Sequence, residues 1–293
     1  MKWFDYENPK TLSEAIELIS KYGDDSRLIA GGTDLIVQMR IGRRTPKVVI
    51  NTKAVEEMNQ LTCDSSGLTI GAAVPCYKIY QNSEIISAYP GIIDSASLIG
   101  GIQIQGRATL GGNLCNAAPS ADAVPVLIAN RATCNVASSN GTRSIPVEDF
   151  CTGPGQNILN PDELLVSLSF PKHDPNFGSR YIRFIPRNEM DIAVAGAGVS
   201  ITLDNEVIKS IHVALASVAP TPILVKKITE ELTGTNLNPE TLNHAGELAK
   251  EAATPITDMR GTIEYRKHLS DVLTKRALAD AIKRAQGGKV NGR

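Results

Sequence analysis

The pattern of hydrophobic and polar positions along this 293-residue chain predicts two regions that differ in the order of their helices and strands. In the first region, a helix near the N-terminus is followed by short apolar runs that alternate with helical and glycine-rich stretches. In the second region, strand-like runs come first and helical stretches follow. Both orders are typical of domains that combine helices with sheets, so we expect an α+β protein.

The helix near the N-terminus has clear start and stop signals. Thr11 and Glu14 form a capping-box pair, and Gly23 stands where a C-cap glycine would end the helix. The apolar face between them consists of Leu12, Ala15, Ile16 and Ile19. The short β-type runs of the same region lie at 27–30, 47–51, 67–72, 131–137 and 163–170.

A stretch rich in chain-breaking residues, from Phe170 to Gly178, indicates a boundary between two domains. Beyond it we expect three strands and then three helices, at 179–185, 192–203 and 207–218 and at 222–232, 239–252 and 262–285. The first domain would cover 1–175, with subdomains at about 1–55 and 56–175. The second domain would cover 176–286, and 287–293 would form a flexible tail.

Two patterns in the second domain have structural interpretations. Gly196-Ala197-Gly198 lies inside a strand-like run and lacks the third glycine of a nucleotide-binding motif, so we interpret it as a close-packed strand. In the last helix, apolar residues near 3.6-residue spacing predict a stripe that faces the core. The stripe consists of Tyr265, Leu269, Val272, Leu273, Leu278 and Ile282.

The composition narrows the class of protein. With 42% hydrophobic and 21% charged residues, the chain can bury enough apolar surface to offset the entropy of ordering, which excludes disorder. With a net charge of −1, it lacks the basic excess of a protein that binds nucleic acid mainly through phosphates. The N-terminus lacks the apolar core of a signal peptide, and no apolar run approaches the roughly 20 residues that span a membrane.

Cysteine and histidine show no arrangement typical of a metal or catalytic site. The cysteines are odd in number and lack C-x-x-C spacing, which argues against a disulfide framework and against a zinc or iron–sulfur site in this chain. Reduced thiols indicate the cytoplasm. The cysteines are Cys63, Cys76, Cys115, Cys134 and Cys151. We expect every histidine to be a surface or packing residue, namely His173, His212, His244 and His268.

Two Gly-Gly turns are the most informative feature of the sequence. The first is Ala30-Gly31-Gly32-Thr33-Asp34, and the second is Thr109-Leu110-Gly111-Gly112-Asn113. Such turns let successive N–H groups converge on an anion, and a neighbouring hydroxyl adds a donor. Two of them could hold a pyrophosphate from both sides, mainly through backbone dipoles. A Cβ at Gly111 would then block the ligand without disturbing the fold. The alternative is that both are ordinary tight turns.

Neither turn matches a Rossmann fingerprint or a P-loop. Asp122 follows the second turn, in Ala118-Pro119-Ser120-Ala121-Asp122. Its carboxylate could accept hydrogen bonds from ligand hydroxyls, or it could cap the short helix that we expect next. The residues alone leave both roles open.

At these residues the chain resembles a known family, the FAD-binding subunits, or medium chains, of the molybdenum hydroxylases. This family includes subunits of bacterial xanthine dehydrogenase, nicotinate dehydrogenase, carbon monoxide dehydrogenase and 4-hydroxybenzoyl-CoA reductase. The resemblance covers nearly the whole chain. Its motifs include Ala30-Gly31-Gly32-Thr33-Asp34-Leu35, Arg107-Ala108-Thr109-Leu110-Gly111-Gly112-Asn113, Ala118-Pro119-Ser120-Ala121-Asp122, Pro161-Asp162-Glu163-Leu164-Leu165 and Glu264-Tyr265-Arg266.

The resemblance implies a p-cresol methylhydroxylase-type FAD-binding domain of two subdomains, followed by a small α+β C-terminal domain. It also implies that FAD is bound non-covalently and that no residue is catalytic. Asp122 would bind ribityl or ribose hydroxyls, Leu165 and Ile99 would lie near the cofactor, and Arg183 would lie near the isoalloxazine. The residues expected to surround the pyrophosphate and adjoining sugar are Arg27, Leu28, Ile29, Ala30, Gly31, Gly32, Thr33, Asp34 and Leu35, with Thr109, Gly111, Gly112, Asn113 and Asn116.

The resemblance further implies partner chains. A large molybdenum–pterin subunit would hydroxylate the substrate, and a small [2Fe–2S] subunit would pass electrons to the FAD. The three kinds of chain would assemble as a dimer of heterotrimers. The electrons would then leave to an acceptor such as NAD+. Two departures from the carbon monoxide dehydrogenase pattern, Thr33-Asp34 in place of His-Ser and Ile192 in place of an aromatic residue, favour the xanthine or nicotinate dehydrogenase side.

Three alternatives stay open at this point. The chain could be a carbon monoxide dehydrogenase medium chain, an autonomous FAD-dependent oxidoreductase of the same fold, or a non-enzymatic scaffold whose glycine turns are only turns. The 4-hydroxybenzoyl-CoA reductase subunit carries a cysteine-rich insertion for a [4Fe–4S] cluster, and this chain has no such cluster of cysteines.

Overall fold

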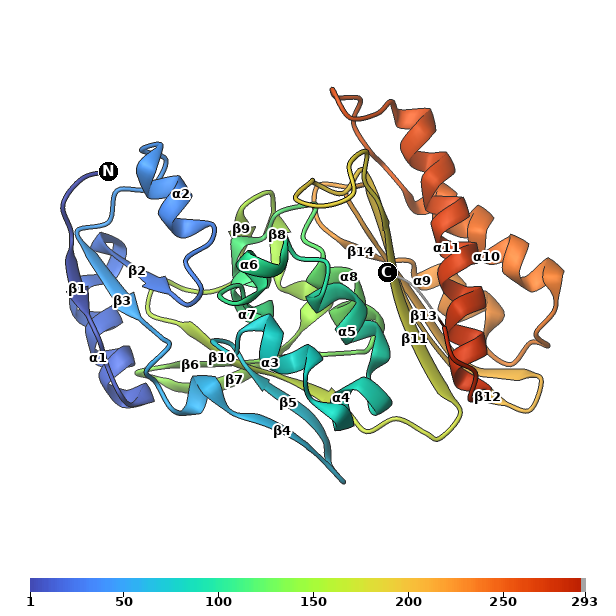
Figure 1. Ribbon diagram of the computed structural model, residues 1–293, viewed down its shortest axis with the longest axis horizontal. Helices are drawn as coiled ribbons and strands as arrows, with labels where there is room; N and C mark the ends of the chain where they lie inside the picture. Colours follow the sequence, from blue (N-terminus) through green and yellow to red (C-terminus); the bar gives the residue numbers. More distant parts are fainter. Residues whose placement is uncertain (291–293) are drawn as a thin grey trace.

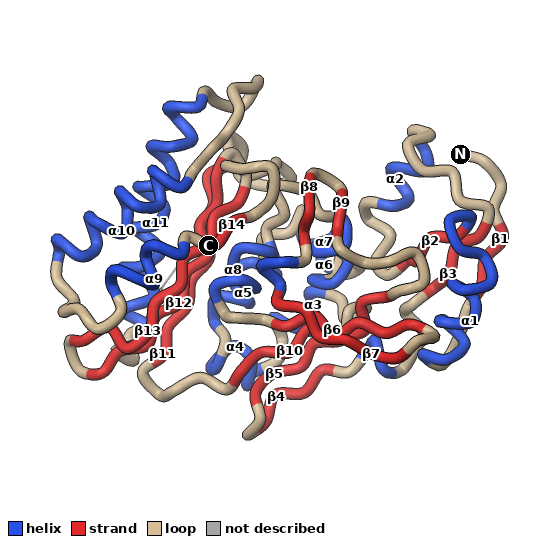
Figure 2. Tube along the Cα trace, turned by 180° about the vertical axis from the view of Figure 1, so that it is seen from behind, coloured by secondary structure: helices blue, strands red, loops and turns tan. Residues whose placement is uncertain are grey.

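The computed structural model describes residues 1–290, in which three larger sheets lie in a row (Figure 1). A small parallel sheet lies at the N-terminal end, a five-stranded sheet lies in the centre, and a four-stranded sheet lies at the C-terminal end. Helices fill the space between the central and C-terminal sheets (Figure 2). The mixture of helices and strands confirms the expected α+β class. The predicted tail at 287–293 falls partly on residues 291–293, which lie outside the described residues.

The N-terminal sheet has the order β1-β3-β2 and is fully parallel. Its strands are β1 (Asp5–Glu7), β2 (Ser26–Ile29) and β3 (Val48–Asn51), and its helices are α1 (Leu12–Tyr22) and α2 (Leu35–Arg40). Thr11 caps α1, since its hydroxyl accepts from the Glu14 N–H at 3.2 Å, and Gly23 ends the helix. The Glu14 carboxylate accepts from the N–H of Lys10 at 2.6 Å instead of that of Thr11, so only half of the predicted capping box is correct.

The central sheet is antiparallel in the order β4-β5-β10-β6-β7. Its strands are β4 (Leu61–Asp64), β5 (Gly67–Gly71), β6 (Thr133–Ser138), β7 (Gly141–Pro146) and β10 (Leu164–Pro171), and β8 (Cys151–Gly153) pairs with β9 (Gln156–Asn157) nearby. Short helices cover this sheet: α3 (Cys76–Tyr80), α4 (Ser83–Ala88), α5 (Pro90–Ala96), α6 (Ile102–Gln105), α7 (Leu110–Asn116) and α8 (Ala123–Ala129). The edge strands β4 and β7 were not predicted, because β4 has only four residues, none of them fully buried, and most residues of β7 are exposed.

The C-terminal sheet is antiparallel in the order β11-β12-β13-β14. Its strands are β11 (Phe177–Phe184), β12 (Ala195–Asp204), β13 (Val207–Ala216) and β14 (Ile223–Leu224), followed by α9 (Lys226–Leu232), α10 (Pro239–Ala252) and α11 (Ile263–Ala285). One face of the sheet packs against α11, with α10 beside that helix, and the other face packs against α5 and α8 (Figures 1 and 2). The helix predicted from 222 begins later because the first of its residues pair with β13.

Helix α8 is therefore enclosed, and all seven of its residues are buried. The interpretation of Gly196-Ala197-Gly198 as a close-packed strand is confirmed, since a Cβ at Gly198 would lie 2.5 Å from the carbonyl carbon of Pro125 in α8. In α11, most of the predicted stripe is buried, but Tyr265 is 40% exposed and contacts Phe184 edge-on. Tyr265 therefore lies at the margin of the core and not within it.

Ion pairs hold the C-terminal domain against the helices of the first domain. Asp94 in α5 accepts from Arg180 of β11 at 2.9 Å and from Arg284 of α11 at 2.6 Å. All three side chains are largely buried. Residues from two domains are thus fixed relative to one another, which matters for a site to which both contribute.

Candidate functional site

The two Gly-Gly loops, which are far apart in the sequence, lie against each other in the structure. A Cβ at Gly31 would be only 2.1 Å from the carbonyl oxygen of Arg107 and 3.0 Å from the N atom of Ala108. No residue with a side chain could make this approach without moving the backbone. The contact joins the first loop to Arg107 and Ala108, the two residues before Thr109, where the second loop begins.

The first loop connects β2 to α2 and leaves several N–H groups open. Gly32 has φ of +78°, a left-handed conformation that glycine adopts without strain. Its carbonyl accepts the N–H of Ile36 at 3.0 Å, which is an early hydrogen bond of the helix. The N–H groups of Thr33, Asp34 and Leu35 precede that bond, so helix geometry leaves them available to a ligand.

The second loop is the first turn of α7, with Thr109 as its N-cap. The Thr109 hydroxyl accepts from the N–H of Gly112 at 2.8 Å, and its carbonyl accepts from Asn113 at 3.0 Å. The N–H groups of Leu110 and Gly111 have no acceptor within the helix. A Cβ at Gly111 would lie 2.7 Å from the Cα and carbonyl oxygen of Ala72. The expectation that this Cβ would leave the fold intact is therefore wrong, because it would meet backbone.

Two amide side chains of α7 tie the second loop to its surroundings. The Asn113 side-chain oxygen accepts from the N–H of Ala123 at 3.1 Å, which connects α7 to the start of α8. The Asn116 side-chain oxygen accepts from the Gln38 side chain at 3.0 Å, which connects α7 to α2. Both asparagines therefore fix the relative positions of the elements that carry the predicted site.

Asp122 lies at the start of α8, is only 8% exposed, and is bound by two side chains of β11. The Tyr181 hydroxyl donates to one carboxylate oxygen at 2.9 Å, and the Arg183 guanidinium donates to the other at 2.6 Å. Its side chain makes no capping bond to α8, which excludes the capping role. Burial raises the pKa of the Asp122 carboxyl, while the Arg183 charge and the Tyr181 hydrogen bond lower it.

The remaining predicted positions differ in where the structure places them. Leu165 in β10 and Ile99 after α5 are buried apolar residues. Leu28 and Ile29 lie along β2 and lead into the first loop. The guanidinium of Arg27 points away from the loops, because it donates to the carbonyls of Asp24 and of Ser26, the first residue of β2. Its position at the opposite end of β2 from Gly31 separates it from the two Gly-Gly turns.

The backbone of two residues with positively charged side chains, Lys53 and Arg107, lies next to the first loop, and neither was among the predicted site residues. Thr52, next to Lys53, donates its N–H to the carbonyl of Ile29 at 3.0 Å, and Arg107 contributes the carbonyl that meets Gly31. Burial lowers the pKa of Lys53, and the positive charge of Arg107 lowers it further. Within residues 1–290, no ion pair joins either cation to a carboxylate. The one feature of the sequence that could have identified Arg107 as a site residue is its position just before the second loop.

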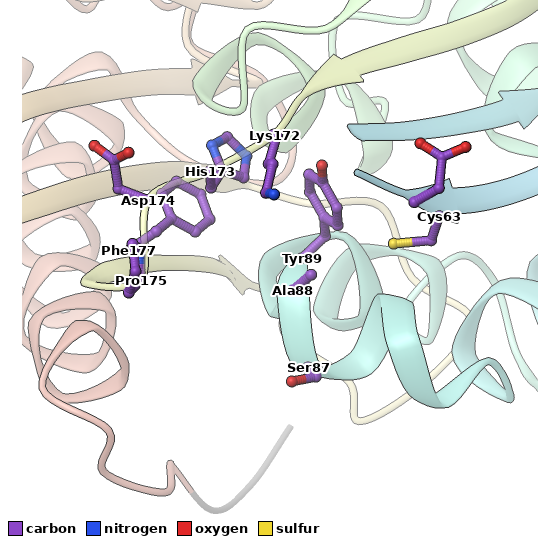
Figure 3. Close-up of a pocket in the computed structure, with 10 residues that line it drawn as sticks. Cys63, Ser87, Ala88, Tyr89, Lys172, His173, Asp174, Pro175 and Phe177 are labelled. Atoms are coloured by element: carbon purple, nitrogen blue, oxygen red, sulfur yellow. The ribbon is translucent and has the colours of Figure 1, made fainter. Parts of the chain in front are cut away.

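Two cavities lie outside the glycine loops. One, of about 250 Å³, is at the linker between the domains, where Tyr89, His173 and Phe177 come together (Figure 3). The His173 and Phe177 rings stack with centroids 3.5 Å apart, and burial lowers the pKa of His173 to about 4. The other, of about 420 Å³, is lined by residues that include Arg131 and His212. No residue of either glycine loop lines them, so they are separate from the predicted site.

Comparisons with known proteins identify the domains. Residues 2–173 match the family model described as the FAD binding domain in molybdopterin dehydrogenase, and residues 180–281 match the CO dehydrogenase flavoprotein C-terminal domain. The chain is 33% identical over 288 residues to a xanthine dehydrogenase FAD-binding subunit from Escherichia coli O157:H7, covering 97% of this chain and 98% of the relative. It is 28% identical to a carbon monoxide dehydrogenase medium chain from Afipia carboxidovorans, covering 97% and 98%.

Solved structures agree with the sequence matches. Carbon monoxide dehydrogenase from Hydrogenophaga pseudoflava, in a form lacking the Mo-pyranopterin moiety, superposes with a TM-score of 0.93 at 27% identity, covering 97% of this chain and 98% of that chain. Fold and matches together define an FAD-binding domain joined to a flavoprotein C-terminal domain. The chain belongs to the FAD-binding medium subunits of the molybdenum hydroxylase family, and it is an oxidoreductase subunit. The scaffold alternative is therefore wrong.

The features of the site fit this cofactor. The glycine loops offer N–H groups to an anion, Lys53 and Arg107 near the first loop carry positive charge, and the buried Asp122 carboxylate can accept hydrogen bonds from hydroxyl groups. Among residues 1–290, no helix is long and apolar enough to cross a membrane.

Proposed function

We propose that this chain carries FAD as the electron-transfer subunit of a multi-subunit molybdenum hydroxylase. The observation that supports this best is the contact of Gly31 with the Arg107 carbonyl, which brings the two glycine loops together. Asn113 of the second loop also binds the N–H of Ala123 at the start of α8, next to Asp122. When bound, FAD supplies the redox chemistry, accepting electrons from a [2Fe–2S] partner and passing them to NAD+. The residues of this chain bind and orient the cofactor, and none acts as a general acid or base.

The pyrophosphate end of the cofactor would lie between the two loops. The N–H groups of Thr33, Asp34, Leu110 and Gly111 would donate to its oxygens, because each precedes the first N–H of its helix that has an acceptor within the helix. The positive charges of Lys53 and Arg107 would neutralise the phosphates. This differs from the expectation that backbone dipoles would meet most of the phosphate charge and that no lysine or arginine would be required.

The hydroxyl-bearing part of the cofactor would lie at Asp122, whose carboxylate is already fixed by two donors. Leu165 and Ile99 would supply apolar contacts, and Arg183 would place a positive charge near the flavin ring. Because Arg183 belongs to β11, the C-terminal domain would contribute directly to the cofactor site.

Relatives that are named medium chains of carbon monoxide dehydrogenase support a role in a larger assembly. We propose a large molybdenum–pterin subunit and a small [2Fe–2S] subunit as partners, in a dimer of heterotrimers. The five cysteines of this chain are free thiols, and we propose the cytoplasm as its location, since thiols stay reduced there.

The experiment that tests this function uses the chain purified alone and together with its co-expressed partner chains. We expect one FAD per chain, a flavin absorbance spectrum, and reduction of that FAD by the substrate of the complex only when the partner chains are present. Absence of saturable FAD binding in both preparations would contradict the proposal. Reduction by an organic donor without partners would instead support an autonomous oxidoreductase.

The second candidate is the medium chain of a carbon monoxide dehydrogenase, favoured by the TM-scores of 0.93 and 0.92 to solved enzymes of that type. Thr33-Asp34 and Ile192 depart from that pattern, as the sequence indicated. Comparing carbon monoxide with xanthine and nicotinate as electron donors to the purified complex separates the candidates. Flavin reduction by carbon monoxide, with none by xanthine or nicotinate, would favour the carbon monoxide dehydrogenase medium chain.

A further inference from the structure

We propose that Tyr181 is a positioning residue for the Asp122 carboxylate, and that Gly196 is required because it leaves space for the Tyr181 hydroxyl. This inference rests on the proposed function, in which the Asp122 carboxylate accepts hydrogen bonds from hydroxyl groups of FAD. It means that two strands of the C-terminal domain, β11 and β12, complete a site whose other residues lie in the first domain.

Strand geometry explains how β11 reaches Asp122. Tyr181 and Arg183 are two positions apart on β11, so their side chains lie on the same face of the sheet. That face packs against α8, and Asp122 stands at the start of α8. Tyr181 is 1% exposed, so its hydroxyl has no alternative partner in bulk water. Its hydrogen bond to Asp122, at 2.9 Å, therefore fixes both groups.

The two donors leave the carboxylate with free acceptor capacity in a defined direction. An ionised carboxylate has about four acceptor positions, and Tyr181 and Arg183 each take one, on different oxygens. The remaining positions are oriented because neither oxygen can rotate away without losing a buried hydrogen bond. Hydroxyl groups of a ligand would thus meet a carboxylate that is already held in place.

The hydrogen bond from Tyr181 to Asp122 requires glycine at position 196 on the neighbouring strand, β12. It pairs with Arg183 in the β11–β12 register, and a Cβ there would lie 2.7 Å from the Tyr181 hydroxyl oxygen and 3.3 Å from its ring. A tyrosine ring cannot flex as a linear side chain can, so the added methyl would displace the hydroxyl from Asp122. Gly198 has a different role, since a Cβ there would meet the backbone of α8.

The hydrogen bond between Tyr181 and Asp122 affects the pKa of the Asp122 carboxyl, which a purely packing role of Tyr181 would not do. The titratable groups that act on the Asp122 carboxyl are Arg183 and Tyr181, both from β11. Each lowers the pKa of that carboxyl against the effect of burial. Removing the Tyr181 hydroxyl therefore raises the pKa of Asp122, and the carboxylate form is lost at a higher pH.

The test is Tyr181→Phe, measured by titration of the purified chain with FAD across pH 4.5 to 8. We expect a dissociation constant for FAD about tenfold higher, and a loss of affinity on acidification that begins at higher pH than in the wild type. Tyr89→Phe is the matched control, because Tyr89 is equally buried and its hydroxyl donates to Pro171 away from Asp122. That control should leave both the affinity and its pH profile unchanged.

Gly196→Ala provides an independent variant. It should weaken FAD binding as Tyr181→Phe does, and the two effects should not add in the double variant, because both act on one hydrogen bond. Folded Tyr181→Phe protein with wild-type affinity and pH profile would overturn the inference. If Asp122→Asn weakens binding while Tyr181→Phe does not, the inference fails and the proposed function stands. If the wild-type chain binds no FAD even with its partner chains, the proposed function fails.

Discussion

Replacing Lys53 by methionine tests how the chain meets the charge of the pyrophosphate. Methionine keeps the unbranched stem and removes the positive charge. The ammonium of Lys53 hydrogen-bonds to the side-chain oxygen of Asn51, which would still accept the Lys53 N–H at 3.1 Å. Without a ligand, burial and the nearby Arg107 disfavour the Lys53 charge. Lys53→Met should therefore leave the unliganded chain as stable as the wild type, or slightly more so.

The expected effect on FAD binding follows from Coulomb's law. Two opposite unit charges about 5 Å apart, at an effective dielectric constant of about 20, attract by about 3 kcal/mol. Lys53 is half-buried, so solvent reduces this further, to about 1–2 kcal/mol. The dissociation constant for FAD should therefore rise about 5- to 30-fold. Salt should weaken FAD binding less in the variant than in the wild type, since one charge pair is gone.

Fluorescence titration with FAD and with riboflavin is the assay, because riboflavin lacks both phosphates. We expect Lys53→Met to weaken FAD binding and to leave riboflavin binding unchanged. Lys47→Met is the matched control, since Lys47 is exposed and pairs with Asp25 outside the loops. An equal loss for FAD and riboflavin, or a lower melting temperature of the unliganded chain, would refute the reasoning and assign Lys53 a structural role.

Three further predictions follow from the same contacts. Gly31→Ala should force the loops apart at the Arg107 carbonyl, destabilising the chain by about 1–3 kcal/mol and abolishing FAD retention on gel filtration; a variant with wild-type melting temperature and flavin content would contradict the close contact. Asp122→Asn should weaken FAD binding by about 1–3 kcal/mol by calorimetry, and unchanged affinity would remove Asp122 from the site. Burial lowers the pKa of both His173 and His212 to about 4, below the value near 6.5 in an unfolded chain. Both stay neutral when folded, so stability is fully present above pH 6.5 and is lost as pH falls toward 4, by about 1–2 kcal/mol per histidine between pH 7 and 5; urea unfolding with equal stability at those two pH values would exclude this.

Local signals predicted the elements that position the site. The start and end of α1 were readable because Thr11 and Gly23 act within one turn of the helix. The two Gly-Gly turns were candidates for ligand-binding loops because paired glycines let successive N–H groups converge on an anion. The residues alone did not separate this role from ordinary tight turns, and the structure adds a packing reason, since a Cβ at Gly31 or Gly111 would meet backbone. Their contact with each other was expected only from the pyrophosphate hypothesis, and the structure supplies it through Gly31 and Arg107.

Long-range contacts decided what the sequence left open. The residues alone left Asp122 two roles, and the resemblance favoured the binding of ligand hydroxyls. The structure removed the capping role, since β11 brings Tyr181 and Arg183 to the carboxylate, and no local pattern links these positions. Lys53 was missed for the same reason, because its place beside Arg107 depends on the parallel pairing of β2 with β3. The edge strand β7 was missed because an exposed strand needs no apolar alternation.

The central claim is that FAD lies between the two glycine loops. Amide hydrogen exchange of the purified chain, with and without saturating FAD, tests it most directly, since a bound pyrophosphate would cover the N–H groups of both loops. We predict that FAD slows exchange in residues 30–35 and in 109–116 together. Saturable FAD binding that protects neither segment would contradict the account.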